Sequence, residues 1–191
     1  SFGTRYVNGS TIAYRINCLA YFLDTLVTNT PQSLTTTHLI MLYTLLSFNH
    51  NPNIVFDDDD DPMSFNEIYT TPLHMLLYTY QSNLPFNRQT LQALQLFFSV
   101  QNFTPEIVNT SGLSLPLIFL PLKAYQPFTI YTQSLILYIL HQPKINPARP
   151  DPVSFGNIAS HSLQYQHLGT NIQYDMTIFR QQIIPYFLSR G

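Results

Sequence analysis

Residues 11–48 read TIAYRINCLAYFLDTLVTNTPQSLTTTHLIMLYTLLSF and predict two apolar helices separated by the break Thr28-Asn29-Thr30-Pro31. In each half the apolar residues recur at steps of three and four, which places them on one face of a helix. Because the connection is short, we expect the two helices to pack antiparallel as a hairpin. The first stripe contains Ile12, Ile16, Leu19, Leu23 and Leu26, and the second contains Leu34, His38, Met41, Leu42, Leu45 and Phe48.

The composition of the chain is that of a folded protein with an unusual surface. Its 191 residues are enough for one domain with a sizeable core, and 45% of them are hydrophobic. Only 9% are charged, against roughly 25% in an average protein. The 13 tyrosines and 14 phenylalanines exclude a disordered chain. A surface of Asn, Gln, Thr and Tyr with so little charge is typical of protein that packs against other protein.

The distribution of charge and hydropathy excludes two kinds of partner. The net charge is −2, and half of the ten acidic residues form the single run Asp57–Asp61. The basic residues are scattered singly, so the electrostatic footprint of tight nucleic-acid binding is missing. The longest apolar run, Leu135–Leu140, is far shorter than the roughly 18–20 residues of a membrane-spanning helix. The sequence therefore predicts neither strong nucleic-acid binding nor a membrane span.

The predicted fold is mainly α, an irregular bundle of short helices joined by Pro-rich connectors. Helix starts are indicated by Ser10 or Thr11, Thr30, Thr71 and Asn87, each of which precedes an apolar helical pattern. A further helix is predicted over Thr129–His141, which is apolar nearly all round. Prolines that follow the helices are unequally spaced, which excludes a regular solenoid repeat.

The pattern of prolines and apolar residues divides the chain into four predicted segments. Residues 111–127 contain an apolar run broken by prolines, which fits either buried extended chain or a short helix, and residues 153–170 are the other place for minor β structure. The predicted segments are an extended arm at 1–10, a helical core domain at 11–142, a Pro-rich linker at 143–152, and a C-terminal segment at 153–191 whose terminal helix packs on the core or on a neighbouring subunit.

No residue pattern carries a catalytic or ligand signature. The Asp57–Asp61 run lacks the alternating ligands and the glycine of a calcium loop, so it reads as a solvated acidic loop. Cys18 reads as a small buried hydrophobe. We therefore predict no catalytic, cofactor-binding or metal-ligating residue and no cofactor. The histidines never reach the spacing of zinc ligands; they are His38, His50, His74, His141, His161 and His167.

The line Thr11–Asp24, TIAYRINCLAYFLD, resembles helical shell segments in the coat proteins of small double-stranded RNA viruses, the partitivirus kind especially. The helix–Pro–helix continuation to Phe48 shares the same texture of Tyr/Phe/Leu helices, Thr-Pro caps and few charges. The resemblance implies a mostly α-helical subunit that self-assembles into a closed shell whose inner surface attracts RNA only weakly.

The expected function is that of a non-enzymatic virion structural protein, a coat or cement subunit in a large assembly. Its expected partners are copies of itself or other structural proteins of that assembly, and its expected location is the virion or the host cytoplasm. Two alternatives stay open at this point: an accessory subunit of a large organellar membrane or ribosomal complex, located inside the organelle, and an enzyme of unrecognised type.

Overall fold

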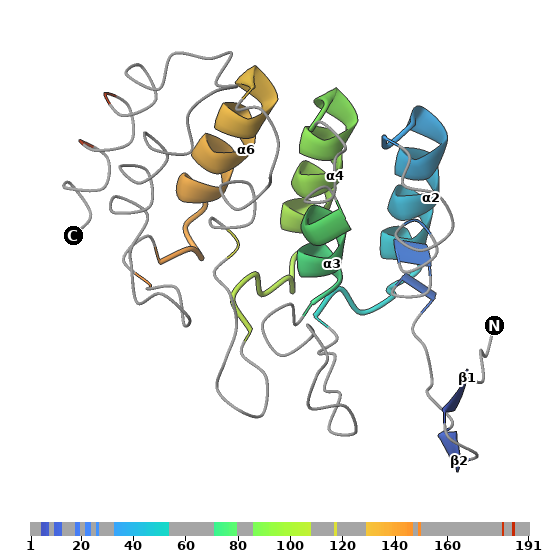
Figure 1. The fold of residues 1–191 in the computed structure, drawn as a ribbon. Coiled ribbons are helices and arrows are strands. Elements are labelled where there is room, and N and C mark those ends of the chain that lie inside the picture. Colours follow the sequence, from blue (N-terminus) through green and yellow to red (C-terminus); the bar gives the residue numbers. More distant parts are fainter. Residues whose placement is uncertain are drawn as a thin grey trace.

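The computed structural model confirms a mainly α protein (Figure 1). Its described part contains the helices α2 (Thr36–Ser47), α3 (Pro72–Thr79), α4 (Arg88–Ser99) and α6 (Ile130–Leu140). Two short strands, β1 (Arg5–Val7) and β2 (Ser10–Ile12), precede them. The structure describes residues 5–7, 10–12, 18–19, 22–23, 26, 33–53, 71–79, 86–107, 117, 129–146, 149, 181 and 185.

Helices α2, α4 and α6 lie side by side in one row, with α4 in the middle (Figure 1). All three run in the same direction. At the N-terminal end of the row, Asn87 Nδ2 donates a hydrogen bond of 3.2 Å to the carbonyl of Leu34, just before α2. At the other end, Lys144 Nζ, after α6, donates to the carbonyl of Phe103, after α4. The sequence pattern did not predict that these three helices run parallel.

Each helix of the row begins with the same reciprocal cap. The side chain at the N-cap accepts from the backbone N–H three residues later, and the side chain of that later residue accepts from the N-cap backbone N–H. No acidic residue occupies any of the first turns. The cap side chains therefore supply the hydrogen-bond acceptors for free backbone N–H groups at these helix starts. The cap pairs are Thr35–His38, Asn87–Thr90 and Thr129–Thr132.

The C-terminus of α2 is closed by Asn49, the residue with a positive φ, 57°, among the described non-glycine residues. Its N–H bonds to the carbonyl of Leu46 over 3.2 Å, and the N–H of His50 bonds to the carbonyl of Leu45 over 3.3 Å. This pair of bonds is the Schellman motif, in which Asn replaces the commoner glycine. Helix α2 therefore ends at Ser47, with Phe48, the last residue of the predicted stretch 11–48, as its C-cap.

One apolar core joins the inner sides of these helices. Residues Leu19 and Leu23 of the first predicted stripe are helical and buried. The core also contains Leu42 and Leu46 of α2, Leu94 and Phe97 of α4, and Ile136 and Ile139 of α6. Aromatic rings fill the α4–α6 seam, where Phe98 meets Tyr138 edge-to-face at 5.8 Å and Phe103 at 5.2 Å.

Two predicted helix starts are wrong. Residues Ser10–Ile12 form a strand that pairs antiparallel with β1, so neither Ser10 nor Thr11 caps a helix. The predicted extended arm therefore contributes β1 to a hairpin, whose register pairs Val7 with Ser10. Helix α2 is capped by Thr35 and not by Thr30, because the His38 side chain completes the cap there. The predicted cap at Asn87 is confirmed. The helix predicted from Thr129 is also confirmed, with Thr129 as its N-cap and Ile130 as its first residue.

The predicted core stripe of α2 is partly wrong. Leu34 and Leu42 are buried, but Met41 and Phe48 are exposed, and Leu46 occupies the buried position. Helix α2 is apolar around most of its circumference, so the three-four spacing alone did not fix which side turns inward.

The predicted linker 143–152 is described as far as residue 146 and at 149, where Ile145 is buried in the core. Of 111–127 and 153–170, the two segments given as places for minor β structure, only Leu117 is described, and it is buried in a turn. The rest of both segments lies outside the described residues. The antiparallel direction of the first helical hairpin stays a prediction, although the Phe22 ring does meet the His38 ring at 6.3 Å.

Candidate interaction surface

The outer face of α2 is a surface of apolar side chains without a charge. Ile40 is 62% exposed, Met41 51%, Tyr43 60%, and Phe48, which caps the helix, 74%. No residue of α2, Thr36–Ser47, is acidic or basic apart from His38, which is half-buried beside Phe22. We call Ile40, Met41, Tyr43 and Phe48, with the threonines between them, the α2 outer face. Contiguous exposed apolar surface of this kind marks sites of protein contact more often than single scattered residues do.

Helix geometry sorts these residues around the α2 axis. At 100° per residue, Thr36, Ile40, Thr44 and Ser47 lie along the centre of the outer face, opposite the buried Leu42. Tyr43 lies on the edge toward α4, and Met41 and Phe48 lie on the other edge. Thr44 adds little polarity, because its Oγ1 already donates to the carbonyl of Ile40 over 2.8 Å. The centre of the face therefore combines the Ile40 side chain with small hydroxyl-bearing side chains, and the larger apolar side chains lie along its two edges.

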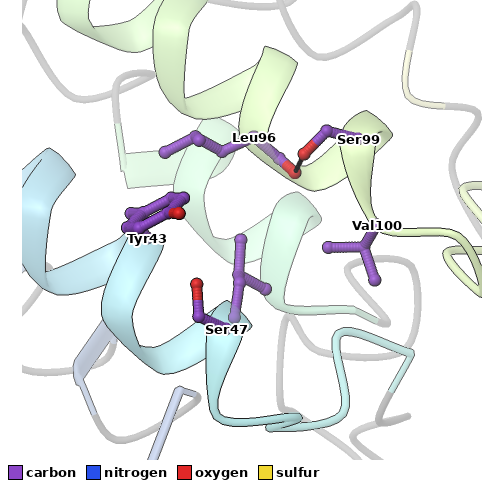
Figure 2. Close-up of a pocket in the computed structure, with 6 residues that line it drawn as sticks. Tyr43, Ser47, Leu96, Ser99 and Val100 are labelled. Atoms are coloured by element: carbon purple, nitrogen blue, oxygen red, sulfur yellow. Dashed lines mark hydrogen bonds between the residues drawn. The ribbon is translucent and has the colours of Figure 1, made fainter.

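A small groove borders this face where α2 meets α4 (Figure 2). Its volume is about 100 Å³. The lining is half hydroxyl and half apolar, and the Ser99 hydroxyl is occupied by a 2.7 Å bond to the Leu96 carbonyl. Small-molecule sites usually measure several hundred Å³ or more, so this groove is large enough for a side chain or a few waters and too small for a cofactor. Tyr43, Leu46 and Ser47 line it from α2, and Leu96, Ser99 and Val100 line it from α4 and its end.

Polar side chains tie the C-terminal ends of the row together. Asn53, after α2, donates from Nδ2 to the carbonyl of Asn102 over 2.6 Å, and its Oδ1 accepts from the N–H of Thr104 over 2.7 Å. From the other side, Lys144 donates to the carbonyls of Gln101 and Phe103. The loop after α4 is thus held between the segments that follow α2 and α6. These bonds hold α2 in place relative to α4 and so fix the orientation of the outer face.

An ion pair completes this end of the molecule. Arg149 Nη1 lies 3.6 Å from Glu106 Oε2, and the two side chains are only 19% and 12% exposed. Burial is the largest influence on Glu106 and raises the pKa of its carboxyl, while the Arg149 charge and the Asn146 backbone act in the opposite direction. Glu106 Oε1 is buried without a hydrogen-bond partner in the structure. A single carboxylate held by an arginine in this way is typical of a structural tie between segments.

Three of the described histidines weighed from sequence for chemistry are engaged in local contacts. His38 serves the α2 cap, His74 is buried against Thr71 Oγ1 at 2.8 Å, and His141 Nδ1 lies 2.6 Å from the carbonyl of Leu137. Within the described part of the chain, no group of three His, Cys, Asp or Glu residues could hold a metal ion. Cys18 is half-buried rather than fully buried. The Asp57–Asp61 run, His161 and His167 lie outside the described residues.

Sequence reasoning missed the residues that shape this surface. Asn53, Lys144 and Glu106 gave no signal, because their partners lie more than forty positions away along the chain. The α2 outer face did carry one signal: Thr36–Ser47 has no acidic, lysine or arginine residue.

Comparisons with known proteins give no family for this surface. No protein-family description, curated protein or solved structure matches the chain. Among the described helices, none is both long and apolar enough to cross a membrane.

Proposed function

We propose that the protein is a non-enzymatic structural subunit of a large protein assembly, a coat or cement subunit of a virion. The observation that carries the proposal is the α2 outer face, where Ile40, Tyr43 and Phe48 are each more than half exposed on a helix without a formal charge. Water-exposed apolar surface of this kind costs free energy, and covering it with protein recovers that free energy.

The rest of the described architecture supports an assembly role. A row of helices with tied C-terminal ends is a stiff element, and a stiff element can present a face to a neighbour with little loss of conformational entropy on binding. Lys144 and Arg149 are engaged in bonds within the chain, which favours protein partners over nucleic acid. The low charge of the whole sequence points the same way.

The experiment is a measurement of molar mass by size-exclusion chromatography with light scattering, over a range of protein and salt concentrations, with negative-stain images of the largest species. Assembly through apolar faces strengthens or persists as salt rises, because screening weakens only charge contacts. We expect species well above the 22.0 kDa of one chain. A 22.0 kDa monomer at every protein and salt concentration would overturn the proposal.

A further inference from the structure

We draw no further inference here: the strongest candidate, the exposed apolar outer face of α2 with Ile40, Tyr43 and Phe48, carries none because nothing in the structure shows what covers it.

Discussion

The amide of Asn53 donates to the carbonyl oxygen of Asn102 over 2.6 Å, although the two residues are 49 positions apart in sequence. The same amide accepts from the N–H of Thr104 through Oδ1. One side chain thus pairs with the backbone of the loop after α4 much as a neighbouring strand would. The relative position of α2 and α4 depends on it, and with that position the direction in which the α2 outer face points.

Replacing Asn53 by alanine should lower the free energy of unfolding by about 1–3 kcal/mol, because the N–H of Thr104 and the carbonyl of Asn102 lose this partner. Urea denaturation followed by circular dichroism measures the change. Asn53→Asp separates the two bonds, since a carboxylate still accepts from Thr104 but no longer donates. An alanine variant as stable as the wild type would show that water replaces both bonds.

The two sides of α2 should respond differently to truncation. Leu42→Ala removes a side chain that is 2% exposed, and should cost about 2–5 kcal/mol. Ile40→Ala removes an exposed side chain and should change the stability of the monomer by no more than about 0.5 kcal/mol. Denaturation at a protein concentration low enough to prevent association compares them. Similar losses at the two positions would mean that the outer face is covered within one chain.

Asn49 tests the end of α2. Glycine has no steric penalty at a φ of 57°, so Asn49→Gly should be neutral or stabilising. Asn49→Ala should cost about 1–2 kcal/mol, because an alanine Cβ crowds the following carbonyl in this conformation. Thermal unfolding of the two variants gives the comparison. The opposite order would contradict the left-handed conformation of this residue.

Glu106 should make stability depend on pH. Burial raises its pKa above the ordinary value of 4.5, so between the two values the folded state binds more protons than the unfolded state. Stability contributed by this group is therefore fully present below pH 4.5 and is lost as the pH rises through the higher, folded-state pKa. Unfolding free energies at several pH values should fall more steeply with rising pH for the wild type than for Glu106→Gln. If the unfolding free energies of the two proteins changed with pH in parallel, the Glu106 carboxyl would have to be exposed to water.

The sequence predicted local structure best where a polar cap precedes an apolar run. Asn87 caps α4 as expected, and α6 begins where the helix from Thr129 was predicted, because both N-cap side chains bond only three residues away. Thr35 was missed because Thr30, which precedes Pro31, carries the stronger sequence signal of a helix start five residues earlier. The strand at Ser10–Ile12 was missed although Asn8-Gly9, the strongest short hairpin signal, precedes it.

The candidate surface was harder to predict for a physical reason. Helix α2 has apolar residues around most of its own circumference. The sequence therefore showed that the helix lacks charge, but it did not show which of its sides is buried in the core. The buried side of α2 depends on contacts between residues far apart in sequence. Two of them are the hydrogen bond from the Asn53 amide to the Asn102 carbonyl and the hydrogen bond from the Asn87 amide to the Leu34 carbonyl. No local pattern reports such contacts.

The shared direction of α2, α4 and α6 also arranges the electric field of the molecule. Each helix carries roughly half a negative elementary charge at its C-terminus, and three such termini lie at one end of the row. Parallel neighbours repel one another through these partial charges. Lys144 and Arg149, two of only eight cations in the chain, are placed at that end. A protein that has almost dispensed with charge has thus kept two positive side chains where its own backbone potential is most negative.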